Sequence, residues 1–212
     1  MTHKRNVAIF IFDDMEVLDF AGPFEVFNVT GEIIDPPPFH VYTVAQSAEP
    51  VYARGRLSIN PHYTIDNCPA PDILLVPGGF GTRALMKNEA LLAWLREQSE
   101  RLNHLLSVCT GSLVLGAAGL LEGLEATTHH TTMDLLRKHA PGATIHEDRR
   151  FVDNGQIITS GGISAGIDMA LYVVSKLLPE DQLRATLKEM EYDWEPERHA
   201  KVWAKMPGLQ TP

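Results

Sequence analysis

Short apolar runs recur along the chain and predict the strands of a sheet. Runs rich in β-branched and aromatic residues, without alternating polar side chains, are typical of strands buried on both faces. Weaker patterns of the same kind lie at 144–145 and 151–152. The clear runs, and therefore the predicted strands, are 7–12, 39–44, 73–76, 105–108 and 156–159.

Apolar residues at helical spacing lie between these runs, so helices are predicted to alternate with the strands. Pro23 begins a further predicted helix within 19–27, because proline is tolerated in a first turn. Alternating strands and helices indicate βαβ units and an α/β fold with a mostly parallel central sheet. The other predicted helices are 89–102, 111–121, 132–139 and 167–178, with one more beginning at 180.

Glycine-containing turns follow three of the predicted strands, at 77–81, 109–111 and 160–162. The carboxyl ends of parallel strands meet at one edge of a sheet, and ligands of such sheets bind there. We therefore expect these turns, which are far apart in the sequence, to form one site.

The length and composition predict one globular domain, 1–212. The chain has 212 residues and a formal net charge of −9. This excess of acidic residues argues against a nucleic-acid partner, because phosphate binding needs clustered Lys and Arg. No apolar stretch reaches the ~20 residues that span a membrane, and the first apolar run lacks a signal-peptide cleavage site. Two cysteines, Cys68 and Cys109, do not make a disulfide framework, so we expect free thiols in a cytoplasmic protein.

Cys109 lies where a predicted strand runs directly into a predicted helix, in the segment SVCTGS at 107–112. Such a turn is a nucleophile elbow, which holds a side chain at the start of a helix. The amide groups and the dipole of a helix N-terminus stabilise a thiolate and lower the pKa of a thiol. A free cysteine is more often a buried core residue. The elbow favours a reactive thiol instead.

Asp19 is flanked by apolar residues in the sequence, in LDFAGP at 18–23. Burial raises the pKa of a carboxyl, and a protonated carboxyl can donate to a thiolate or act as a general acid. The alternative is a helix N-cap, which is a common role for Asp.

Gly78 and Gly79 follow a predicted strand and allow close approach of backbone amides to a ligand. The alternative is a plain turn that ends the strand. Neither G-x-G-x-x-G nor G-x-x-x-x-G-K-S/T, the glycine-rich motifs that bind nucleotide phosphates, occurs in the sequence, so no nucleotide cofactor is expected.

His129 and His130 are candidates to orient or deprotonate the thiol, but they lack the companion ligands of a metal site. For Asp168 the alternatives are support of the site and a role in capping a helix or in an interface.

Taken in order, D-x-x-GP, PGG-x-G, VCTGSLVLGAAGLL, ATTHH and SGGISAGID resemble the ThiJ/PfpI superfamily, which is related to the class I glutamine amidotransferase fold. The resemblance implies a flavodoxin-like three-layer sandwich, usually a homodimer, with Cys109 as the elbow cysteine. It places Asp19 where the family has the acid that contacts the thiolate. It also implies an anion hole formed by Gly79 and the backbone N–H of Cys109.

Protease-like members carry His directly after the cysteine, where this chain has Thr110. Asp19, together with CTG and GGISAGID, is most similar to the branch that hydrates isocyanides. There a thiolate attacks the isocyanide carbon, an acid protonates the adduct, and water releases an N-substituted formamide. The resemblance implies Cys109 as nucleophile, Asp19 as general acid and base, and Thr110 hydrogen-bonding near the thiolate. It implies a small-molecule substrate without a cofactor or metal, bound by Gly78, Gly79, His129 and Ile163.

Two other functions stay open. One is a non-catalytic or redox-sensing module whose thiolate is oxidised, which needs an accessible cysteine of low pKa. The second is a glyoxalase or deglycase acting on small aldehydes, which the superfamily also contains. The motifs also resemble the amidase-like domain of AraC-type regulators. Such regulators continue into a helix-turn-helix domain, whereas this acidic chain ends at Pro212, so a regulator is not expected.

Overall fold

The structure is a computed structural model that describes residues 4–195, so the ends of the predicted domain, 1–3 and 196–212, lie outside it. Its centre is a seven-stranded sheet in the order β10–β11–β7–β6–β1–β2–β5, in which all neighbours are parallel except β10 and β11. The strands are β1 (Arg5–Phe10), β2 (Phe39–Ala45), β5 (Tyr63–Thr64), β6 (Ile73–Val76), β7 (His104–Val108), β10 (Phe151–Asp153) and β11 (Ile157–Ser160).

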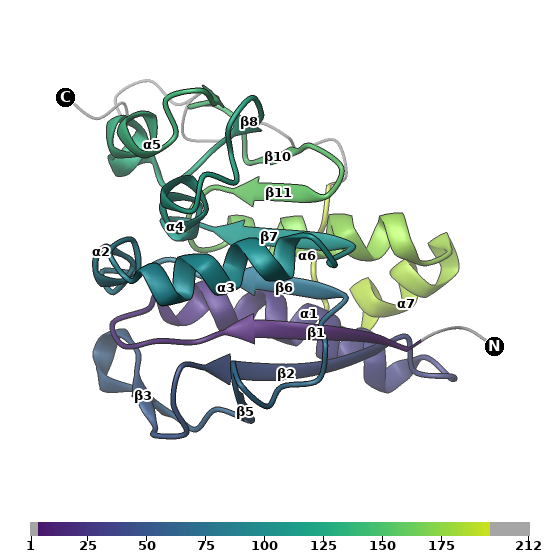
Figure 1. The fold of residues 1–212 in the computed structure, drawn as a ribbon. Coiled ribbons are helices and arrows are strands. Elements are labelled where there is room, and N and C mark those ends of the chain that lie inside the picture. The colour runs from purple at the N-terminus through teal and green to yellow at the C-terminus, as the bar shows by residue number, and fades with distance from the viewer. Residues whose placement is uncertain (1–3, 196–212) are drawn as a thin grey trace.

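Helices cover both faces of the sheet and make the three-layer α/β sandwich that the sequence predicts. On one face α1 (Val17–Ile33), α6 (Ala165–Leu177) and α7 (Glu180–Glu189) pack against one another. On the other face lie α2 (Thr82–Leu85), α3 (Glu89–Ser99), α4 (Gly111–Ala117) and α5 (Met133–His139). Figure 1 shows α3 in front of the sheet and α1 and α6 behind it.

The central strands are apolar because both of their faces are covered. Every residue of β6 and β11 is buried. Ile9, Leu75 and Leu106 pair across β1, β6 and β7, and each is fully buried. The core of the molecule therefore runs through the same strands whose carboxyl ends carry the three predicted turns.

Short elements escaped the sequence pattern, because two to four residues show no periodicity. Besides α2 and β5, they are the strands β3 (Val51–Tyr52), β4 (Ser58–Ile59), β8 (Glu125–Ala126) and the 3-10 turns η1 (Arg54–Arg56) and η2 (His130–Thr132). The weak pattern at 144–145 is confirmed as β9 (Thr144–Ile145), which pairs with β8.

Several helix boundaries differ from the predicted ones, including the end of α1 at Ile33 instead of 27 and the end of α3 at Ser99 instead of 102. Pro23 lies inside α1 instead of beginning a helix, and it removes the N–H that would bond to the carbonyl of Asp19. Helix α4 ends at Ala117 and not at 121. Gly119 has a φ of 76°, a left-handed conformation in which the helix does not continue.

The three glycine-containing turns meet at the carboxyl edge of the sheet, as predicted. The backbone N–H of Cys109, after β7, donates to the carbonyls of Ser160, the last residue of β11, and of Gly161, which follows it, at 3.2 and 3.1 Å. On the other side of β7, the turn after β6 contributes Gly78 and Gly79. Among the described helices, none has the length and apolar character needed to cross a bilayer.

Truncating Leu75 tests whether these strands form the core. Leu75→Ala is expected to lower the free energy of unfolding by about 2–5 kcal/mol, because the cavity it leaves in a packed sheet closes only partly. Urea denaturation measures the change. Leu57→Ala is the matched control, since Leu57 is 47% exposed, and it should cost less than about 0.5 kcal/mol. Equal losses in the two variants would contradict the fold.

Candidate active site

Cys109 is held in a strained conformation between β7 and α4. Its φ is 56°, in the left-handed region, which costs a non-glycine residue about 1–3 kcal/mol. Hydrogen bonds hold it there on both sides: its N–H bonds the two carbonyls after β11, and its own carbonyl accepts from Thr128 Oγ1 at 2.8 Å. The side chain is only 7% exposed. The predicted elbow is therefore present, with its thiol at the floor of the site.

Asp19 lies beside this thiol, although the two residues are 90 positions apart in the 212-residue chain. Its carboxyl group is fully buried and lies next to the Cys109 side chain, close enough for each group to shift the pKa of the other. Its two oxygens accept backbone N–H groups, one from Gly78 at 3.1 Å and one from Ile163 at 3.0 Å. The N-cap of α1 is Glu16, so the N-cap alternative for Asp19 is wrong.

Gly78 allows Asp19 and Cys109 to come this close. A Cβ at position 78 would lie 2.6 Å from the Thr110 nitrogen, 2.7 Å from Cys109 Cβ and 2.8 Å from Asp19 Oδ2. All three distances are shorter than van der Waals contact, so a side chain here would push the pair apart. Gly78 therefore positions the pair from behind and does not line the cavity above it.

Burial dominates the protonation of the pair. It raises the pKa of Asp19 to about 7, against the opposing effect of the two backbone N–H groups and of Cys109. It also raises the pKa of the Cys109 thiol, and the negative charge of Asp19 raises it further. The expectation that a helix N-terminus lowers this pKa is wrong here. Helix α4 has only seven residues, and desolvation together with a neighbouring carboxylate outweighs its dipole.

The pair therefore keeps at least one proton near neutral pH. Two negative charges side by side in a buried site repel each other, so the two groups titrate together and not separately. The proton can lie on sulfur or on the carboxyl, and their proximity allows it to pass from one to the other.

Thr110 acts differently from the expectation. Its backbone N–H, not its hydroxyl, lowers the pKa of the Cys109 thiol and so favours the thiolate. Its Oγ1 accepts the N–H of Gly79 at 2.9 Å and lies 3.2 Å from Thr82 Oγ1. The expected anion hole also needs correction, because the N–H groups of Gly79 and Cys109 both already donate within the protein.

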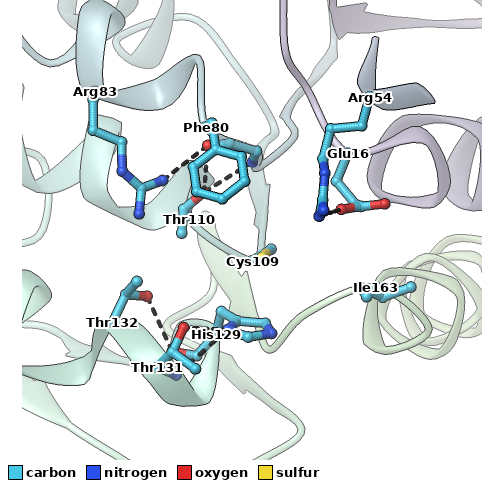
Figure 2. Close-up of a pocket in the computed structure, with 11 residues that line it drawn as sticks. Glu16, Arg54, Phe80, Arg83, Cys109, Thr110, His129, Thr131, Thr132 and Ile163 are labelled. Carbon is cyan, nitrogen blue, oxygen red and sulfur yellow. Dashed lines mark hydrogen bonds and ion pairs between the residues drawn. The ribbon is translucent and has the colours of Figure 1, made fainter. Parts of the chain in front are cut away.

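A small cavity of about 120 Å³ opens above the thiol. Figure 2 shows the sulfur of Cys109 between Thr110, Phe80 and Arg83 on one side and His129, Thr131 and Thr132 on the other. Of the residues predicted to bind substrate, Gly79, His129 and Ile163 line the cavity. The full lining is Glu16, Arg54, Gly79, Phe80, Arg83, Cys109, Thr110, His129, Thr131, Thr132 and Ile163.

His129 and Ile163 are fixed by their neighbours. The His129 ring lies against Gly162, where a Cβ would collide with it, and its Nδ1 is 2.8 Å from Thr131 Oγ1. Ile163 has a φ of 55° and is 41% exposed, while its N–H holds Asp19. His130 stacks on His129 with 4.4 Å between ring centroids and is not part of the cavity lining.

Comparison with known proteins decides the family. Residues 5–176 match the DJ-1/PfpI family. The chain belongs to this family. It is 38% identical to an isonitrile hydratase of Pseudomonas putida, over 88% of this chain and 78% of that one. It is 25% identical to a helix-turn-helix transcriptional regulator of Pseudomonas aeruginosa over 89% of this chain, which spans 50% of the regulator.

A solved structure agrees with this assignment. The crystal structure of a ThiJ/PfpI family protein from Pseudomonas syringae superposes with a TM-score of 0.83 and 32% sequence identity, covering 96% of this chain and 81% of that one. The likeness extends beyond the matched family segment to nearly the whole chain. The flavodoxin-like DJ-1/PfpI fold is therefore shown.

Six cavity residues of this DJ-1/PfpI protein were not among the site residues predicted from the sequence: Glu16, Arg54, Phe80, Arg83, Thr131 and Thr132. They come from the segments after β1, β3 and β6 and from η2, and only the fold brings these segments together. Two further residues that the sequence suggested, Asp168 and Cys68, lie outside the cavity lining.

Asp168 is paired with Arg150 and accepts the Tyr192 hydroxyl at 2.8 Å, and it does not line the cavity. Cys68 is a half-buried free thiol outside the cavity lining. Within 4–195 no three His, Cys, Asp or Glu residues gather as a metal site would need.

Asp19→Asn tests the electrostatics of the pair. Removing the negative charge is expected to lower the pKa of the Cys109 thiol and move its alkylation profile at least about one pH unit lower. Alkylation by iodoacetamide is followed by intact mass from about pH 6 to about pH 10. The Cys68→Ser background leaves Cys109 as the one cysteine that can be alkylated. Asp134→Asn, a change at an exposed carboxylate, should leave the profile in place. An unmoved or upward-shifted Asp19→Asn profile would contradict the site.

Proposed function

We propose that the protein hydrates small isocyanides to N-substituted formamides, with Cys109 as nucleophile and Asp19 as proton carrier. The observation that carries the proposal is the close approach of these two buried side chains at the floor of the cavity. Identity of 38% to a protein named isonitrile hydratase supports the same reaction class.

The first half of the reaction needs one proton carried over a short path. Asp19 takes the thiol proton as Cys109 Sγ bonds to the terminal carbon of the isocyanide. That carbon then holds an electron pair, to which Asp19 returns the proton, leaving a thioimidate with a C–S bond and a C=N bond. A carboxyl with a pKa of about 7 suits both roles, because it gains and loses a proton readily at neutral pH.

The second half releases the product. Water adds to the thioimidate carbon and its protons pass to nitrogen and back to the pair. The C–S bond then breaks, with its electrons returning to sulfur. The sum is one isocyanide and one water giving one formamide, without an oxidant or reductant. The Thr110 backbone N–H, which favours the thiolate, makes Cys109 a better leaving group in this step.

The shape of the site supports a small substrate. A cavity of about 120 Å³ is below the ~300–1,000 Å³ of pockets for drug-sized ligands. A peptide would need an extended groove, and the His that follows the cysteine in protease-like relatives is Thr110 here.

The site gives less support to redox sensing. Oxidation proceeds through the thiolate, and the pKa of Cys109 is raised, not lowered. The glyoxalase alternative, the homodimer and the cytoplasmic location stay predictions.

Turnover of a panel of neutral isocyanides tests the function. The tert-butyl, cyclohexyl and methyl-isocyanoacetate compounds should each yield their formamide, followed by loss of the isocyanide infrared band and by proton NMR. Cys109→Ala should abolish turnover, and Asp19→Asn should lower kcat by about 10²–10⁴-fold, the usual contribution of a positioned acid and base.

Cys68→Ser is the matched control and should retain full activity, because that thiol lies outside the cavity lining. Methylglyoxal is assayed in parallel. Consumption of methylglyoxal with no formamide from any isocyanide would replace the proposal with the glyoxalase alternative.

A further inference from the structure

Two arginines stand at the cavity of an otherwise acidic protein. Arg54 and Arg83 both line it, in a chain whose formal net charge is −9. The exposed ring of Phe80 contacts both guanidinium groups: Arg54 Cζ is 5.3 Å and Arg83 Cζ 5.5 Å from the ring centroid. Figure 2 shows Arg83 on the Thr110 side and Arg54 on the opposite side, next to Glu16.

The two positive charges are not equivalent. Arg54 Nη1 lies 2.6 Å from Glu16 Oε2, so this pair has no net charge. Arg83 Nη1 donates to the Gly79 carbonyl at 3.0 Å and to Thr82 Oγ1 at 3.2 Å. Both of these acceptors are uncharged, and no ion pair of Arg83 is found with a carboxylate in 4–195. The arginine and glutamate side chains of the lining therefore leave one uncompensated positive charge, on Arg83.

This charge lies close to the reacting sulfur. Thr82 Oγ1, which accepts from Arg83, is 3.2 Å from Thr110 Oγ1, and Thr110 directly follows Cys109. The guanidinium is thus linked through two hydrogen bonds to Thr110, the residue that follows Cys109. Only Nη1 is engaged in these bonds, and a guanidinium carries five N–H donors in a planar fork.

We propose that Arg83 binds an anionic group of the substrate, and that the substrate class is a short aliphatic isocyanide bearing a carboxylate. The planar fork of arginine matches the two oxygens of a carboxylate. The Phe80 ring beside it gives the carbon chain an apolar contact. That the substrate is an isocyanide rests on the proposed function, whereas the anion site rests on Arg83 alone.

A purely structural role for Arg83 makes a different prediction. By bonding the Gly79 carbonyl it also supports the turn after β6. Loss of that support would weaken charged and neutral ligands alike, whereas loss of an anion site weakens only the charged one. The experiment therefore compares a carboxylate with its own methyl ester.

Binding is measured first, without any turnover. N-formylglycine and its methyl ester, the products expected from the two matched isocyanides, are titrated into the protein by calorimetry. The wild type should bind the carboxylate about tenfold more tightly than the ester, as one charge-assisted contact provides. Arg83→Gln should bring this ratio close to one, and Arg83→Lys should restore part of it.

Arg56→Gln controls for the loss of one positive charge nearby, because Arg56 neighbours Arg54 in η1 and is not part of the cavity lining. It should keep the wild-type ratio. Equal affinity of the wild type for acid and ester, or a ratio unaffected by Arg83→Gln, would overturn the anion site.

Turnover of isocyanoacetate and its methyl ester then separates the two proposals. A kcat/KM ratio that favours the acid in the wild type and falls about tenfold in Arg83→Gln supports both. Turnover of both compounds with no preference would overturn the substrate class and leave hydration standing. Preferential binding of N-formylglycine without turnover of either compound would overturn hydration and the substrate class, and leave the anion site standing.

Discussion

The close approach of the Asp19 carboxyl to the Cys109 thiol is the interaction on which the site depends. It brings two acidic groups together in a place where neither is well hydrated. Such a pair is stable only while it holds a proton, and that requirement gives it both a nucleophile and a proton carrier. The surrounding backbone serves this contact: the left-handed turn at Cys109, the missing side chain at Gly78, and the N–H of Ile163.

The topology explains why a single contact can join residues so far apart in the chain. Strands β1, β6, β7 and β11 are neighbours in the sheet, so the segments that follow them converge at one edge. Each contributes one part: Asp19 after β1, Gly78 after β6, Cys109 after β7, and the Ile163 amide after β11. The DJ-1/PfpI fold supplies this frame, and the lining of the cavity determines what reacts within it.

The central sheet and the elbow could be predicted from the sequence, because each is indicated by a pattern of residues that are adjacent in the chain. Buried strands are apolar runs, and the elbow is a cysteine where a strand meets a helix. The pKa of Cys109 could not be predicted in this way, because desolvation and the charge of Asp19 come from other segments. The same holds for Thr110, whose hydroxyl bonds Gly79 across the sheet edge, and for Arg83, which no motif marks.

The claim that Asp19 and Cys109 hold their proton as one unit is tested most directly by infrared difference titration. The band of a protonated carboxyl should disappear with a midpoint near pH 7 and should be absent in Asp19→Asn. In Cys109→Ala the midpoint should move higher, because the thiol no longer stabilises the carboxylate. A midpoint near 4, the ordinary value for Asp, and unchanged in Cys109→Ala, would contradict the account.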